Sequence, residues 1–228
     1  MILYRQLMRS GYPLLVNAPW KSSLPYVFMA LAALSRWPGL FPQNFSAIYA
    51  VAFCAGAFFC GPKKWVLPFG TLLISDLALN SYYYFVKHVD AFQPFQLFNY
   101  AAFAVIIVFG KKFSNRSRLD SLVAGGIVAA LIFYLITNFA AWLFNPFHNP
   151  EYTRNLAGLI IALTKGTAGH PPTIEFFRNT LMSGGLFTAL FAGVLKLTAS
   201  QESAEEKEAA EANEPEPDTE AVPEEAKV

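Results

Sequence analysis

The segment Leu119–Phe144 most constrains the fold, because it is a long apolar run with a single charged residue, Asp120, near its start. About 20 apolar residues are enough for a helix to cross the hydrocarbon core of a bilayer. The segment Ile174–Thr198 is similar in length and composition. Hydrophobic residues make up 54% of the chain and charged residues 14%, against about 25% charged in globular domains. These features predict an all-α integral membrane protein, since a helix satisfies its own backbone hydrogen bonds in lipid.

Six segments are apolar enough to be predicted as transmembrane helices. Arg36 and Pro38 interrupt the first segment, and the second and third are shorter than a full span of about 20 residues. The six segments are Pro25–Phe41, Phe45–Cys60, Trp65–Leu79, Phe92–Gly110, Leu119–Phe144 and Ile174–Thr198.

The distribution of Lys and Arg predicts the orientation, because basic residues accumulate in cytoplasmic loops. Residues 61–64 ("GPKK") and 111–118 ("KKFSNRSR") are the most basic loops. If both loops are cytoplasmic, both termini are cytoplasmic too, and twelve basic residues fall inside against five outside. We therefore expect a multi-pass protein of the bacterial cytoplasmic (inner) membrane.

The charge pattern also predicts three parts of the chain. These are a cytoplasmic N-terminal segment (1–24), a six-helix transmembrane domain (25–199) and an acidic cytoplasmic tail (200–228). The tail has ten Glu and one Asp against two Lys, whereas residues 1–199 have 15 basic and 5 acidic residues. The tail contains almost no large apolar side chain, so we expect it to be disordered, with a short helix allowed over 202–212.

The connection between the last two predicted spans, residues 145–173, contains the apolar stretch "NLAGLIIALTKG". Asn155 can cap a short helix there and Gly166 can end it. Such a helix either covers an outward-facing cavity or rests on lipid, and the sequence leaves both open.

Polar residues of the predicted spans gather at the outer side of the membrane, where they predict an outward-facing substrate pocket. Each has a structural alternative. The amides can bond between helices, and Asp76 can be clamped by Arg36 or Arg178. Arg178 can instead pair with Glu175 within its helix and anchor it at the interface, and Trp142 can belong to an interfacial aromatic belt. An unpaired carboxylate at Asp76 would cost roughly 2.5–3.5 kcal/mol in the membrane, so we expect it to have a partner. The candidate binding residues are Arg36, Asp76, Asn138, Trp142, Arg178 and Asn179.

Several kinds of chemistry find no support in the sequence. The three histidines have no metal-ligand spacing, and there is no phosphate-binding glycine loop or nucleophile-elbow motif. Cys54 and Cys60 are too far apart on one predicted helix to form a disulfide. We therefore expect no metal, cofactor or nucleic acid, and no enzyme. An intramembrane enzyme using Asp76 or Glu175 ranks last, because nothing pairs these two carboxylates.

Stretches of five predicted helices resemble a bacterial family of uncharacterised six-helix membrane proteins, which looks related to the substrate-binding (S) components of energy-coupling factor transporters. The stretches are "MALAALSRW", "NFSAIYAVAFCAGAFF", "LPFGTLLISDLAL", "FYLITNFAAWLF" and "EFFRNTLMSGGLFTALF", and the resemblance covers about residues 25–195. It implies capture of a vitamin-like micronutrient from outside, with a transmembrane coupling protein and ATPases as partners. By this analogy the ligand region contains Asn138, Trp142, Arg178 and Asn179, supported by Asp76 and Arg36.

The first predicted helix departs from the S-component pattern. It lacks the AxxxA spacing with which S components meet their coupling protein, and the nearest equivalent, Ala52 and Gly56, lies on the second helix. The acidic tail is also outside that pattern. The alternative function is therefore a scaffolding membrane protein, whose polar residues hold its helices together and whose tail recruits a cytoplasmic partner.

Overall fold

The structure is a computed structural model that describes residues 19–89 and 93–211. This part of the chain is all helical, as predicted, and contains no β-strand. Its helices are α2 (Pro19–Ser35), α3 (Ile48–Phe58), α4 (Lys63–Lys87), the 3-10 turn η1 (Pro94–Gln96), α5 (Leu97–Gly110), α6 (Leu119–Phe144), α7 (Leu156–Thr164) and α8 (Thr173–Glu211).

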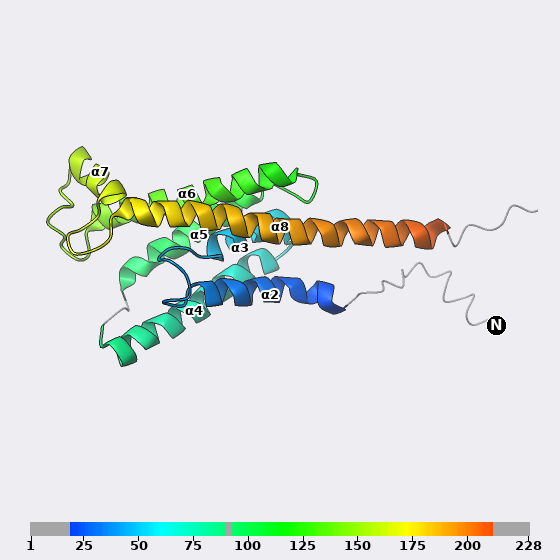
Figure 1. Ribbon diagram of the computed structural model, residues 1–228, viewed down its shortest axis with the longest axis horizontal. Coiled ribbons are helices and arrows are strands. Elements are labelled where there is room, and N and C mark those ends of the chain that lie inside the picture. The colour runs from blue at the N-terminus through cyan, green and yellow to red at the C-terminus, as the bar shows by residue number, and fades with distance from the viewer. Residues whose placement is uncertain (1–18, 90–92, 212–228) are drawn as a thin grey trace, which may run out of the picture.

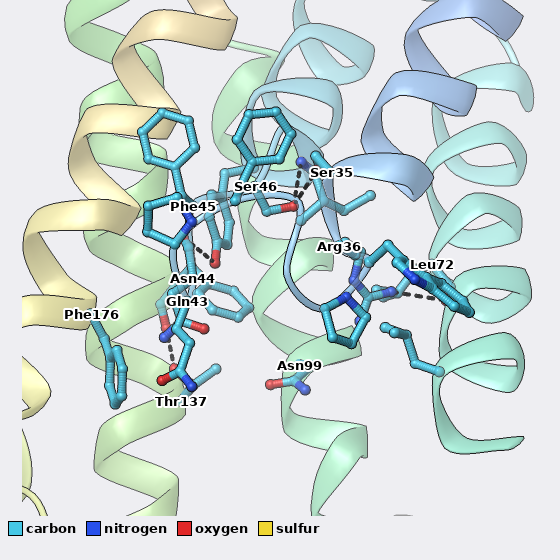
Figure 2. Close-up of a pocket in the computed structure, with 18 of the residues that line it drawn as sticks. Ser35, Arg36, Gln43, Asn44, Phe45, Ser46, Leu72, Asn99, Thr137 and Phe176 are labelled. Carbon is cyan, nitrogen blue, oxygen red and sulfur yellow. Dashed lines mark hydrogen bonds between the residues drawn. The ribbon is translucent and has the colours of Figure 1, made fainter. Parts of the chain in front are cut away.

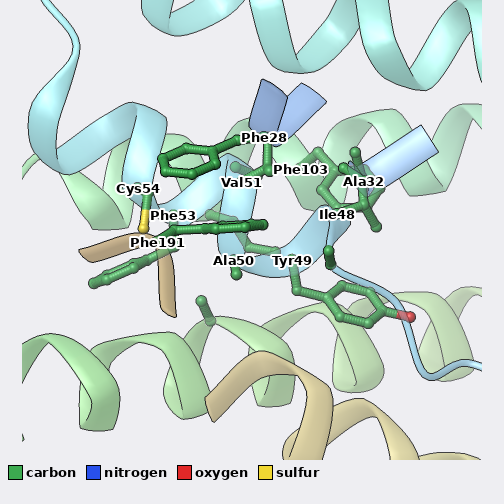
Figure 3. Close-up of a cluster of buried hydrophobic side chains, with 14 of the residues drawn as sticks. Phe28, Ala32, Ile48, Tyr49, Ala50, Val51, Phe53, Cys54, Phe103 and Phe191 are labelled. Atoms are coloured by element: carbon green, nitrogen blue, oxygen red, sulfur yellow. The ribbon is translucent and has the colours of Figure 1, made fainter. Parts of the chain in front are cut away.

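Helix α3 lies in the middle of an elongated bundle and contacts α2, α4, α5, α6 and α8 (Figure 1). Each of its residues from Ile48 to Gly56 is buried. Figure 3 shows Phe53 of α3 within this core, beside Phe28 of α2 and Phe191 of α8. The rings of Phe28 and Phe191 are stacked with centroids 4.3 Å apart. A helix that is apolar on every face is suited to this central place.

Glycines allow the closest helix contacts. A Cβ atom on Gly56 would lie 2.2 Å from the carbonyl oxygen of Ile107, so α3 and α5 meet backbone to backbone. Between α6 and α8, a Cβ on Gly126 would meet the side chain of Thr188 at 2.0 Å. Small residues at such crossings let helices pack without a hydrophobic driving force between them.

The first predicted helix is too long at its C-terminal end, because α2 ends at Ser35 and residues 36–47 form a loop. Pro38 explains the early end, since it has no N–H and disfavours a helical conformation at the residue before it. The second helix is also shorter than predicted. The third is longer, because α4 continues through the polar residues 80–82 to Lys87. The predicted span Leu119–Phe144 coincides with α6.

Helix α8 continues into the acidic tail as far as Glu211. Residues 200–211 are therefore helical, where we expected disorder but allowed a short helix over 202–212. Ala, Glu and Lys are strong helix formers, and an existing helix extends without the cost of a new nucleus. The expectations for residues 1–18 and 212–228 lie outside the described residues.

The short helix predicted between the last two spans is confirmed as α7. The Asn155 side chain accepts a hydrogen bond from the backbone N–H of Gly158 at 2.9 Å, and Gly166 follows the helix with φ of +73°. The Tyr134 hydroxyl of α6 donates to the carbonyl of Leu163. This hydrogen bond joins α7 to α6, and α7 also contacts α8.

Two helices, α6 and the part of α8 from Thr173 to Ser200, are long and apolar enough to cross a membrane by length and composition. Much of their apolar surface points away from the bundle. Met182, Leu186 and Leu190 repeat every fourth residue on α8 and are 59%, 58% and 50% exposed. The apolar helices α2, α3 and α5 are shorter.

Candidate ligand-binding site

A cavity of about 580 Å³ lies at the end of the bundle where the loop 36–47 joins α2 to α3 (Figure 2). Ligand pockets typically have volumes of about 300–1,000 Å³, so this cavity can hold a small molecule. It is lined by residues 35–39 and 41–46, together with Ile48, Tyr49, Leu72, Leu79, Tyr83, Phe95, Asn99, Phe103, Phe133, Thr137, Asn138, Ala141 and Phe176.

The loop 36–47 forms much of the cavity wall, and hydrogen bonds fix both of its ends. The Ser35 hydroxyl lies 3.0 Å from that of Ser46 and accepts a hydrogen bond from the Ala47 N–H at 2.9 Å. Inside the loop, Gly39 and Asn44 have φ of +88° and +61°. Glycine and asparagine tolerate this left-handed conformation better than most residues, which allows the chain to turn twice within a short segment.

Arg36 and Asp76 form an ion pair at the side of the cavity. The Nη2 of Arg36 donates to Oδ1 of Asp76, and Nη1 donates to the Ser75 hydroxyl and, at 3.3 Å, to the carbonyl of Leu72. The Asp76 side chain is 9% exposed and the Arg36 side chain 17% exposed. Of the two arginines considered as partners for Asp76, the structure therefore pairs it with Arg36. This clamp ties the start of the loop to α4.

The ion pair leaves one polar atom unsatisfied. Oδ2 of Asp76 is buried and has no hydrogen-bond partner among the described residues. Asp76 itself is not a lining residue of the cavity, whereas Arg36 is. The guanidinium is thus directed at α4, and its charge is balanced before any ligand arrives.

Neutral polar side chains of α5 and α6 also line the cavity. Nδ2 of Asn138 donates to the Tyr134 carbonyl of its own helix at 2.8 Å, which leaves Oδ1 as an acceptor. The Thr137 hydroxyl donates to the Phe133 carbonyl at 2.9 Å and keeps its capacity to accept. The amide of Asn99, which Figure 2 shows on α5, has no hydrogen bond to any described residue.

Besides Asp76, three more of the residues predicted for the pocket do not line the cavity. The Trp142 indole donates to the Thr153 carbonyl at 2.7 Å, which fastens the end of α6 to the following connection. Arg178 is exposed on α8, and neither residue lines the cavity. Asn179 does not line the cavity, but its Nδ2 donates to the backbone carbonyl of the lining residue Gln43 at 3.0 Å and so holds the loop 36–47 against α8. The six predicted residues are therefore not brought together in one site.

The long connection 145–172 contributes no lining residue, so it does not cover the cavity. The loop 36–47 has that position instead, and its role was missed because "RWPGLF" was read as the end of a helix. Two prolines and a glycine among aromatic residues were the available signal for a loop facing an apolar space. Among the described residues no three His, Cys, Asp or Glu side chains gather as a metal site.

The bundle and its cavity define the class: an all-helical protein with two potential membrane-spanning helices and a ligand-sized cavity at one end. Residues 17–208 match the model of a family of unknown function (DUF6580), and the chain belongs to this family. The match does not connect the chain to S components. No curated protein and no solved structure matches the chain.

Proposed function

We propose that the protein is a multi-pass bacterial inner-membrane protein that captures a small molecule from outside the cell, in the manner of an S component. The observation that carries the proposal is the ligand-sized cavity at one end of the bundle. On this proposal the protein is a binding and uptake subunit without catalytic activity. A transmembrane coupling protein and ATPases would drive transport, and the bilayer is its solvent.

The exposed apolar surface supports a membrane location. Side chains on α2, α4 and α8 that are large and apolar point away from the bundle, such as Leu34, Ile74 and Leu186 at 59%, 68% and 58% exposure. Monomeric soluble proteins rarely expose contiguous apolar surface on this scale. In a bilayer the same side chains contact lipid tails.

The position of the basic residues supports the orientation. Nζ of Lys196 on α8 donates to the carbonyls of Asn115 and Ser117 at 2.7 and 2.8 Å, so α8 passes the basic loop 111–118 at this residue. The start of α4, with Lys63 and Lys64, lies toward the same end of the bundle (Figure 1). The cavity lies at the other end. The positive-inside rule then directs the cavity outward.

Native mass spectrometry of the protein purified in mild detergent tests ligand capture. We expect a bound small-molecule mass that survives gentle release from the micelle. Ala141→Trp places a large side chain at the cavity wall and should remove this mass, whereas Arg178→Ala, outside the cavity, should retain it. A protein that is free of ligand as purified, and that binds nothing from a cell extract, would contradict the proposal.

Cysteine labelling tests the orientation separately. In a Cys60→Ser background, the only remaining native cysteine, Cys54, is buried. A membrane-impermeant maleimide added to intact cells should label Thr167→Cys, in the connection after α7, and should not label Ser117→Cys. The reverse pattern would place the cavity on the cytoplasmic side.

A scaffolding function is the second candidate, and one observation favours it. Helix α8 projects beyond the rest of the bundle as it enters the acidic tail (Figure 1). A helix in that position can present the tail to a cytoplasmic partner. Removal of residues 201–228 distinguishes the candidates, because ligand capture should survive the deletion whereas recruitment of a partner should fail.

A further inference from the structure

We infer that the cavity selects an uncharged, flat ring compound that carries hydrogen-bond donors and acceptors along one edge. The inference rests on the proposed function, because it names the ligand class of the same cavity. It departs from the preference for an anion that an arginine in the site would suggest.

The charge balance of the cavity is the first argument. Arg36 contributes the only formal charge among the lining residues, and its guanidinium is already paired with Asp76 and bonded to Ser75 and Leu72. An anion would have to break this pair and leave the carboxylate of Asp76 buried alone. A cation would find no free carboxylate on the wall. Burying an ion without a counter-charge costs several kcal/mol, so the cavity favours an uncharged molecule.

The aromatic wall is the second argument. Tyr49, Phe103 and Phe133 come from α3, α5 and α6 and form a contiguous cluster of rings, with centroids 4.8 Å apart for Tyr49–Phe133 and 5.1 Å for Phe103–Phe133. The Tyr49–Phe103 pair is stacked, with an interplanar angle of 17°. Aromatic surfaces bind other rings by offset stacking and edge contacts in addition to burying their area. This wall therefore suits a flat ring better than a flexible chain.

The third argument is the set of amides that face the cavity without internal partners. The side chains of Gln43, Asn44 and Asn99 make no hydrogen bond to any described residue, and Oδ1 of Asn138 is free to accept. Each amide offers an acceptor and two donors. Polar groups in protein interiors are almost always satisfied, so the half-buried amides of Asn99 and Asn138 need water or a ligand, whereas the exposed side chains of Gln43 and Asn44 at the rim can also meet solvent. Paired donor and acceptor positions match the edge of a heteroaromatic ring, as when Asn or Gln recognises adenine.

The experiment uses full-length protein in mild detergent, stripped of small molecules by extensive exchange. The probe is the deproteinised small-molecule extract of the cells that produce the protein. The compound retained after washing is identified by native and tandem mass spectrometry, and its affinity is then measured with the purified compound. Asn99→Leu and Asn138→Leu remove the amides at similar side-chain volume. Arg178→Ala is the matched control, and thermal unfolding of each variant confirms that it is folded.

A retained compound that is uncharged at neutral pH and contains a flat ring with donors and acceptors on one edge supports the inference. Each Asn→Leu variant should then bind about tenfold more weakly, the effect of one lost hydrogen bond, while Arg178→Ala binds normally. Retention of a carboxylate, a phosphate, an ammonium compound or a flexible chain overturns the inference and leaves the proposed function standing. Unchanged affinity in both folded Asn variants also overturns it. Retention of nothing overturns the proposed function itself.

Discussion

Removing either member of the Arg36–Asp76 pair should destabilise the protein far more than removing both. Both side chains are mostly buried, and Oδ1 of Asp76 accepts a hydrogen bond from the guanidinium of Arg36. Arg36→Met leaves the carboxylate buried without a counter-charge, and Asp76→Leu does the same to the guanidinium. The loss of one partner of a buried pair typically costs about 3–5 kcal/mol.

The double variant with Met at position 36 and Leu at position 76 removes both charges and keeps apolar volume in their place. Replacing a buried ion pair by apolar residues is often neutral or stabilising, so the double variant should unfold close to the wild-type protein. The coupling energy from the cycle is the difference between the double variant and the sum of the two single costs, so its magnitude should be about 6 kcal/mol or more. Unfolding in mixed micelles with increasing sodium dodecyl sulfate, followed by circular dichroism, measures all four free energies. Additive single effects would refute the view that the pair acts as one desolvated unit.

Three further predictions concern packing and the connection between α6 and α8. Gly56→Ala should lower the free energy of unfolding by more than Gly193→Ala in the same titration, because a Cβ at Gly56 meets the backbone of α5 and one at Gly193 meets nothing within 4 Å. Asn155→Ala removes the cap of α7 at a cost of about 1 kcal/mol, so amide exchange should accelerate in α7 and stay unchanged in α6. The Glu151 carboxylate accepts a hydrogen bond from the N–H of Ala168 at 3.0 Å, which lowers its pKa below the ordinary 4.5. The stabilisation from this hydrogen bond is fully present above pH 4.5 and is lost as the pH falls through the lowered pKa. Amide hydrogen exchange at Ala168, corrected for its intrinsic pH dependence, should therefore rise over that pH range in the wild-type protein. The Glu151→Gln variant should show no such rise.

The parts of the fold that the sequence predicted well depend on local rules. The span Leu119–Phe144 is set by an uninterrupted apolar run, and α7 by the Asn155 cap and the glycine that follows the helix. The end of α2 was missed because the residues around Pro38 are apolar, and apolar character was given more weight than the proline. The end of α4 was missed because Asn80 was read as the close of a span. In the structure Asn80 is buried and exchanges two hydrogen bonds with Gln96, each 3.0 Å long.

The candidate site was only partly predictable from the sequence. Residues predicted to lie at the same depth can point toward different neighbours, because the rotation of each helix about its axis is not set by its hydropathy. Trp142 and Asn138 are four residues apart and were assigned to one wall, yet Trp142 turns to the carbonyl of Thr153. The partner of Asp76 was foreseen as an arginine, since the cost of an unpaired carboxylate demands one. Which arginine it is depends on how α2 and α4 cross, and spacing along the chain carries no information about that.

The unbroken course of α8 has a mechanical consequence. Its 39 residues form a rod about 58 Å long, with Phe176 at the cavity near one end and the first part of the acidic tail at the other. The described helix contains no proline and is assigned as one continuous helix, and its Gly184 packs closely against Ala130 and Gly126 of α6. A tilt of about 5° at the cavity would displace the far end by about 5 Å. The wall of the cavity and the start of the tail therefore belong to one continuous helix.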